Sequence, residues 1–203
     1  MSKSESCGAS CHASAHQARR HILWMVLIIN LSMFFVEIIY SFFANSSSLF
    51  ADSLDMLGDS FAYAISIFVI GRGARAMARA TMIKGVSMLA LGLSVAGAAF
   101  YRFFVAAEPD GSTISIIGAA AMAANVICLL LLTSFKDDDI NMKSVWLCSR
   151  NDLIANSLVI AAGIGVIYTQ SRWPDLIAGM IITYVVLRSS IQVIRSARNY
   201  HGE

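Results

Sequence analysis

The sequence predicts an all-α integral membrane protein, a bundle of six transmembrane helices with both chain ends in the cytoplasm. Of its 203 residues, 57% are hydrophobic and only 14% are charged, whereas about a quarter of the residues of a soluble domain are charged. The charged residues also gather in short stretches between long apolar runs. This alternation is typical of a chain that crosses the membrane several times.

The apolar runs define the expected elements in order. Windows of about 20 residues give six candidate spans, at 22–44, 48–70, 85–105, 113–134, 143–168 and 174–194. The last is expected to be the weakest, because Arg188 interrupts it. The short connections favour antiparallel neighbours. We therefore expect three parts: a cytoplasmic tail with Cys and His over 1–21, a six-helix transmembrane domain over 22–196, and a short cytoplasmic tail over 197–203.

The basic residues predict the orientation. One side of the predicted membrane carries Lys3, Arg19, Arg20, Arg72, Arg75, Arg79, Lys84, Lys136, Lys143, Arg195 and Arg198. The other side carries residues 45–47, Glu108, Asp110, Arg172 and Asp175. Since cytoplasmic loops are enriched in Lys and Arg, both ends are expected in the cytoplasm. A net charge of +2, with no basic stripe, predicts no nucleic-acid partner.

The second span carries three aspartates. Asp52, Asp55 and Asp59 follow one another at steps of three and four residues, which places them on one helix face. Because an ionisable residue in hydrocarbon costs about 3 kcal/mol, the stripe is expected to line a protected polar site. The alternative is structural pairing with Arg150 or Arg188, although Arg150 lies on the opposite side of its span from the aspartate there.

The fifth span repeats this pattern with Cys148, Asp152 and Asn156 at steps of four residues. Carboxylate oxygen and thiolate sulfur are both metal donors, and thiolate favours ions such as zinc. Together with Asp55 and Asp59, Cys148 and Asp152 would give the four ligands of tetrahedral zinc. As alternatives, Cys148 could be a small core residue, and Asn156 could be an outer-shell partner or make a hydrogen bond between helices.

Several other polar or small residues in the spans have more than one candidate role. Glu37, in the first span at a depth matching the second-span aspartates, could carry a proton or act as a hydrogen-bond brace. Asp52 could serve at the outer mouth or cap the start of its helix. In the third span, Gly92 and Ala96 suit a close helix contact, of which a dimer contact is one form.

The N-terminal tail contains a second group of donors: Cys7, Cys11, His12 and His16. Short tracts rich in Cys and His often bind metal. The alternative is a tail whose side chains bind nothing, so this group is a secondary candidate site.

Four stretches resemble the cation diffusion facilitator (cation efflux) family. The stretch SSSLFADSLDMLGD, residues 46–59, resembles its second-helix signature. Residues 141–152 look like its fifth-helix motif, normally His-x3-Asp, while Phe35-Val-Glu37 and the segment Trp173-Pro-Asp175 fit its first and sixth helices. The resemblance runs from about residue 22 to residue 196.

The resemblance implies a function. The family consists of dimeric six-helix transporters that export divalent metal from the cytoplasm, usually against protons. It implies that Asp55, Asp59 and Asp152 are metal ligands and that Cys148 takes the place of the fourth. Zn²⁺ or Cd²⁺ would then be the transported ion, with no separate cofactor and no enzymatic activity, and the partners would be protons, lipid and a second copy of the chain. The expected location is a bacterial cytoplasmic membrane.

The sequence departs from the family pattern at two points. Cys148 stands where the family has His, and a thiolate favours zinc or cadmium over manganese and disfavours magnesium and calcium. The chain also ends soon after the sixth span, where most relatives continue into a cytoplasmic domain. We therefore expect a short member whose dimer is held by membrane helices.

Two other classes of function were weighed. Phosphatidyl-group transferases also hold a catalytic ion with membrane aspartates, but they need Gly after the second one, and here Met56 follows Asp55. A membrane-embedded metal sensor or accessory subunit that binds without transporting is the remaining alternative. Because these ligands bind metal only when deprotonated, metal and protons compete for one site, which favours exchange transport.

Overall fold

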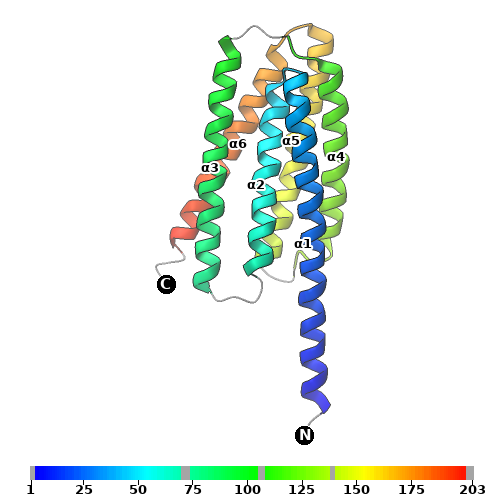
Figure 1. Ribbon diagram of the computed structural model, residues 1–203, viewed down its shortest axis with the longest axis vertical. Helices are drawn as coiled ribbons and strands as arrows, with labels where there is room; N and C mark the ends of the chain where they lie inside the picture. Colours follow the sequence, from blue (N-terminus) through cyan, green and yellow to red (C-terminus); the bar gives the residue numbers. More distant parts are fainter. Residues whose placement is uncertain (1–2, 70–73, 105–107, 138–139, 200–203) are drawn as a thin grey trace.

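The described part of the chain forms a bundle of six helices (Figure 1). The computed structural model describes residues 3–69, 74–104, 108–137 and 140–199. The helices are α1 (Lys3–Phe43), α2 (Ser47–Val69), α3 (Ala74–Phe104), α4 (Gly111–Thr133), α5 (Ile140–Thr169) and α6 (Trp173–Asn199). Those ranges contain no strand, so the predicted all-α class is confirmed.

Four helices contain stretches that are long and apolar enough to cross a membrane: Gln17–Phe43, Gly111–Thr133, Val145–Thr169 and Trp173–Arg195. The sixth span is therefore not the weakest, and Arg188 does not disqualify it. The weaker cases are α3, whose apolar stretch Gly85–Ala98 is shorter, and α2, which carries the aspartates. At about 1.5 Å per residue, the 23 residues of α2 still extend about 35 Å, enough for a crossing.

The outer surface of the bundle is apolar. Large side chains exposed on it come from several helices, including Phe43, Phe100, Leu130 and Tyr184. A water-soluble protein would bury such residues against each other, whereas lipid solvates them at no cost. The surface and the spans together identify an integral membrane protein.

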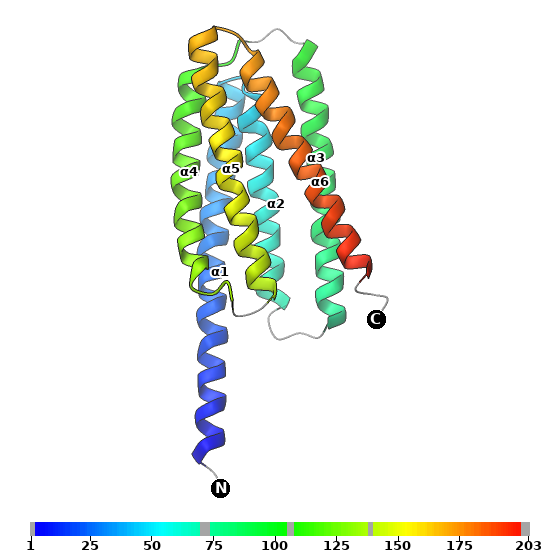
Figure 2. The same cartoon turned by 180° about the vertical axis from the view of Figure 1, so that it is seen from behind.

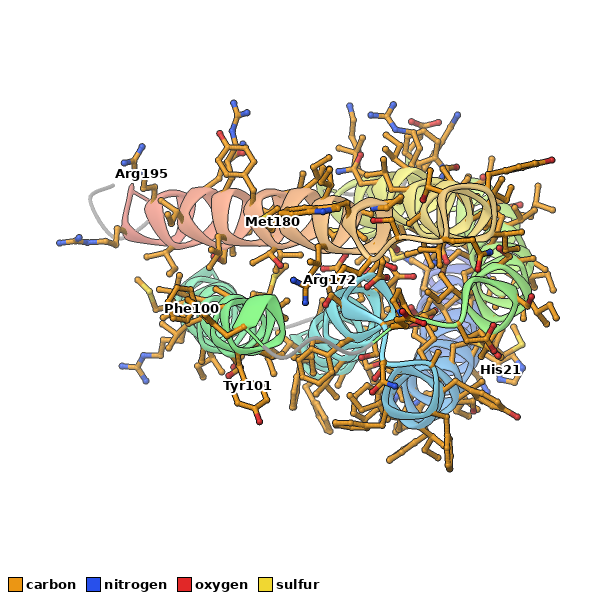
Figure 3. The ribbon with its side chains drawn as sticks, turned by 90° about the horizontal axis from the view of Figure 1, so that it is seen from above. His21, Phe100, Tyr101, Arg172, Met180 and Arg195 are labelled. Carbon is orange, nitrogen blue, oxygen red and sulfur yellow. The ribbon has the colours of Figure 1, made fainter. Side chains whose placement is uncertain are left out.

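The helices associate in pairs. α1 packs on α2, α4 on α5, and α3 on α6, while α2 also contacts α3, α5 and α6. Seen from the end of the bundle, α3 and the C-terminal half of α6 lie on one flank, and α1, α4 and α5 lie on the other side of α2 (Figure 3). The first turns of α1 and the last turns of α6 lie toward the same end, and α1 extends well beyond the bundle there (Figure 2). We call this end the inner end and the opposite end the outer end.

Two apolar clusters stabilise the two ends of the bundle. The outer cluster includes Leu49, Ile114, Val159 and Ile182, and the inner cluster includes Leu23, Tyr63, Leu132 and Val145. Along α2 the three aspartates lie between these clusters, and along α5 Cys148 and Asp152 do. The polar side chains therefore form a layer inside the bundle, sealed by apolar packing on both sides.

Two glycines allow α6 to approach its neighbours closely. A Cβ atom at Gly92 of α3 would lie 2.8 Å from Leu187 Cδ2, and one at Gly179 of α6 would lie 3.0 Å from the backbone of Ser47. The small residue Gly92 thus serves a contact within the chain, between α3 and α6. Gly179 lets α6 lie against the first residue of α2.

Candidate metal site

The four predicted ligands line one cavity. Asp55 and Asp59 come from α2, and Cys148 and Asp152 come from the antiparallel helix α5. The cavity has a volume of about 280 Å³ and is completed by side chains of α3 and α6, including Met88, Ile182, Val186 and Ser189. The sequence prediction that two helices, about ninety residues apart in the chain, face one another with these donors is therefore matched by the fold.

The four side chains differ in burial. Asp59 is 3% exposed and Asp152 is 9% exposed, while Asp55 and Cys148 are half-buried. Asp59 and Asp152 are therefore the two most deeply buried of these four side chains. Asp55 and Cys148 are the more accessible two of the four.

The carboxyl groups of Asp152 and Asp59 lie within hydrogen-bonding range of each other, and Asp55 and Cys148 are close enough to act on Asp152 electrostatically. Oδ2 of Asp152 receives no hydrogen bond from the described residues. Since two carboxylates offer acceptors only, this contact requires a proton or a cation between them. The two carboxyl groups can thus exchange a bound proton for a bound cation.

Neither Arg150 nor Arg188 lines the cavity of the aspartates. The guanidinium of Arg150 lies over the ring of Trp146, 5.6 Å from its centroid, and Arg188 is exposed beside Tyr184 and Gln192 of α6. No basic side chain is found among the described residues that line the cavity. The prediction that Arg150 points away from the site is confirmed.

The site is not a closed coordination sphere. Within the described ranges, no three His, Cys, Asp or Glu side chains converge tightly enough to hold an ion as they stand. The cavity is wider than one ion, so binding requires the side chains of α2 and α5 to turn toward a common centre. The donor types, one sulfur and three carboxylates, suit zinc once they do so.

Tyr63 is a site residue that the sequence prediction missed. Its hydroxyl donates to Oδ2 of Asp59 over 3.4 Å, and the side chain is fully buried in the inner cluster. The signal was present, because Tyr63 continues the stripe of Asp55 and Asp59 by another four residues. A tyrosine that faces a carboxylate inside an apolar span needs a partner for its hydroxyl.

Asn156 lies outside the cavity. Its Nδ2 donates 2.7 Å to the backbone carbonyl of Asp152 in the same helix, and its side chain is buried. This hydrogen bond lies within α5, so it matches neither expected role, an outer-shell partner of the ion or a hydrogen bond between helices. It instead braces the turn of α5 that presents Asp152.

Asp52 and Glu37 are separate from the cavity and pack against each other. They are 1% and 0% exposed, respectively, and their carboxyl groups are at hydrogen-bonding range. The prediction that Asp52 caps α2 is wrong, since Asp175 of α6 accepts the hydrogen bonds of the Ser47 and Ser48 backbone N–H groups. Asp52 lies a full turn farther along the helix and does not line the outer cavity either.

That outer cavity, about 320 Å³ in volume, lies between α2, α3 and α6 at the outer end. Arg172 and Asp175 line it together with Phe50 and Tyr101. In the end-on view, Arg172 projects into the space between α2 and α3 (Figure 3).

The tail residues Cys7, Cys11, His12 and His16 lie on the backbone of α1, but their side chains are outside the described part of the chain.

Comparison with known proteins supplies the context of the site. Residues 23–200 match the model of the cation efflux transmembrane domain. A protein of Bacillus velezensis named "Cadmium, cobalt and zinc/H(+)-K(+) antiporter" is 24% identical over 203 residues, which cover 92% of this chain and 64% of that protein.

Two further relatives carry related names. The "Zinc transporter ZitB" of Yersinia pestis is 24% identical over 79% of this chain and 56% of its own length. The "Metal cation efflux system protein CzcD" of Cupriavidus metallidurans is 21% identical over 78% of this chain and 56% of its own length. The chain thus spans between about half and two thirds of these relatives.

Proposed function

We propose that this chain, which belongs to the cation efflux family, carries divalent transition-metal ions out of the cytoplasm in exchange for protons. Zn²⁺ and Cd²⁺ are the substrates that we assign to it. The observation that carries the proposal is the cavity at mid-depth of the bundle, into which α2 presents Asp55 and Asp59 and α5 presents Cys148 and Asp152.

The donor set supports the choice of metal. Three carboxylates and one thiol match the four-coordinate sites that zinc prefers, and a thiolate excludes the hard ions magnesium and calcium from strong binding. The Bacillus velezensis relative is named for cadmium, cobalt and zinc. The metal acts as the transported substrate, so the site has to release it as well as bind it.

The contacts of the site support coupling to protons. The Asp59–Asp152 pair holds either a proton or a cation, and metal binding requires the carboxyl groups and the thiol to be deprotonated. Metal from the cytoplasm displaces protons, the helices rock around the site, and protons from outside displace the metal. The same relative is named as a "Cadmium, cobalt and zinc/H(+)-K(+) antiporter", with H⁺ among its counter-ions.

The setting of the protein follows from the same proposal. We place both ends in the cytoplasm, with 22–196 as the transport domain between a tail over 1–21 and a short segment over 197–203. The bacterial origin of the relatives supports a bacterial cytoplasmic membrane. We further propose a homodimer, no catalytic role, and a capture site for metal at Cys7, Cys11, His12 and His16.

The test is zinc uptake into vesicles that contain the purified full chain, with zinc binding measured on the same preparation. Wild type is expected to bind zinc and to move it, while Asp59→Ala does neither at equal protein content. A chain that binds zinc in the membrane but passes none would be a sensor or accessory subunit, and the transport proposal would be wrong.

A further inference from the structure

A second pair of carboxyl groups lies inside the bundle, outside the metal cavity. Glu37 of α1 and Asp52 of α2 are 0% and 1% exposed, and their carboxyl groups lie at hydrogen-bonding range of each other. Neither residue lines the cavity of Asp55 and Asp59. The pair is therefore a distinct feature, nearer the outer end of α2 than the metal site.

The oxygens of this pair lack donors. Both Oε atoms of Glu37 and Oδ2 of Asp52 receive no hydrogen bond from the described residues. Two carboxylates have acceptors only, so their contact is repulsive unless something positive lies between them. Burying unpaired charges costs several kcal/mol per ion, which the fold has to offset by binding a positive charge at this point.

Among the described residues, no basic side chain near the pair supplies that charge. α4 packs against α1, which carries Glu37. α3, α5 and α6 pack against α2, which carries Asp52. Apart from the pair itself, α2, α3, α4, α5 and α6 contain seven described titratable side chains that are buried or partly buried: Asp55, Asp59, Tyr63, Cys128, Cys148, Asp152 and Asp175. None of them is basic, and Asp55 also acts electrostatically on Glu37.

The geometry fits a proton better than a metal ion. A structural or transported metal takes four or more ligands, whereas the pair is enclosed by helices and offers two carboxyl groups alone. One proton shared by two carboxyl groups needs no other ligand. It turns one of the groups into a donor and leaves a single negative charge in place of two.

We propose that Glu37 and Asp52 form a proton-binding pair, separate from the metal cavity, that carries part of the counter-ion of transport. The proposal rests on the proposed function, since it assigns a role in proton exchange. A divalent cation among Asp55, Asp59 and Asp152 disfavours a proton on the neighbouring pair. The coupling is reciprocal, so a proton on the pair weakens metal binding by the same factor.

The test counts the protons that Zn²⁺ displaces. Zinc chloride is added to the purified full chain in detergent, in weakly buffered solution near neutral pH, and proton release per bound zinc is read with a pH indicator. The variants are Glu37→Gln, Asp52→Asn and the double variant. Glu37→Gln keeps the shape of the side chain and gives it a donor for Asp52. Ser41→Ala is the matched control, a buried polar change on the same helix, one turn away, whose hydroxyl bonds only the carbonyl of Ile38.

Each single variant is expected to bind zinc and to release about one proton fewer than wild type, because the pair holds its proton as a unit. For the same reason, the double variant is expected to release no fewer protons per bound zinc than either single variant. Ser41→Ala is expected to release the wild-type number of protons. If Glu37→Gln does not fold, Asp52→Asn decides alone. If the folded variants bind zinc and release the wild-type number of protons, the proposal is overturned, and Glu37 is a structural brace. Wild type that binds no zinc would instead overturn the proposed function.

Discussion

The carboxylate of Asp175, at the start of α6, accepts a hydrogen bond of 2.6 Å from the backbone N–H of Ser47, at the start of α2. The N–H and hydroxyl of Ser48 and the hydroxyl of Ser46 bind the same carboxylate, at 3.1, 2.6 and 2.6 Å. The helix that carries the metal-site aspartates is thus capped by a residue from a different helix. A negative charge at a helix N-terminus also interacts favourably with the helix dipole.

Replacing Asp175 is therefore expected to destabilise the protein. Asp175→Ala removes the acceptor of the Ser47 and Ser48 N–H groups and of the Ser46 and Ser48 hydroxyls, for a combined cost of about 2–4 kcal/mol. The hydrogen bond from the Leu49 N–H to the Ser46 hydroxyl remains. Thermal unfolding in detergent measures the loss. Asp137→Ala, at an exposed position between α4 and α5, is the control and should change little. Equal stability of the two variants would show that the α2–α6 contact does not stabilise the bundle.

Asp110 gives a prediction about pH. The Thr113 hydroxyl lowers the pKa of the Asp110 carboxyl below its usual value, burial opposes this effect, and the Ser112 and Thr113 N–H groups lower the pKa further. A lowered pKa in the folded state adds stability above the unfolded value of about 3.9, and that stability is lost as the pH falls below it. Melting temperatures of wild type should therefore fall more steeply with acid than those of Asp110→Asn. Parallel curves would contradict this assignment.

Tyr63→Phe is expected to weaken zinc binding without unfolding the inner cluster. The substitution removes the donor that orients the Asp59 carboxylate and keeps the ring that packs in the core. Loss of an outer-shell partner of a metal ligand costs about 10- to 100-fold in affinity, and the length of this bond favours the lower end. Isothermal titration with zinc measures the change. Tyr168→Phe, at a side chain that is 84% exposed, is the control, and equal affinities would remove Tyr63 from the site.

Cys148 is expected to set the order of metals. Because thiolate favours soft ions, Cys148→Ser should lose cadmium transport more than zinc transport, and Cys148→His should retain zinc. A metal panel in vesicles measures the ranking. Cys128→Ala serves as the control for loss of a thiol, since Cys128 is buried and accepts a long contact, 3.6 Å, from Asn30 instead of facing the cavity. The same ranking in wild type and both Cys148 variants would exclude Cys148 as a selectivity ligand.

The sequence predicted the site better than its surroundings. Steps of three and four residues fixed which side chains share a face of α2 and of α5, so the two halves of the site could be named before any fold was known. Helix periodicity does not reveal which neighbour a face meets. The contact of Glu37 with Asp52, the packing of Gly92 on α6 and the cap from Asp175 therefore became visible only in the bundle. Tyr63 was overlooked although it follows the same spacing.

Exchange of zinc for protons is tested most directly by simultaneous recording of zinc and internal pH in vesicles that contain the purified chain. Zinc is expected to move only together with an opposite flow of protons, and Asp152→Asn is expected to abolish both. Asp152 supplies one wall of the cavity and contacts Asp59, so its loss removes metal and proton binding at once. Zinc flux that leaves the internal pH unchanged, or that survives in Asp152→Asn, would contradict the account.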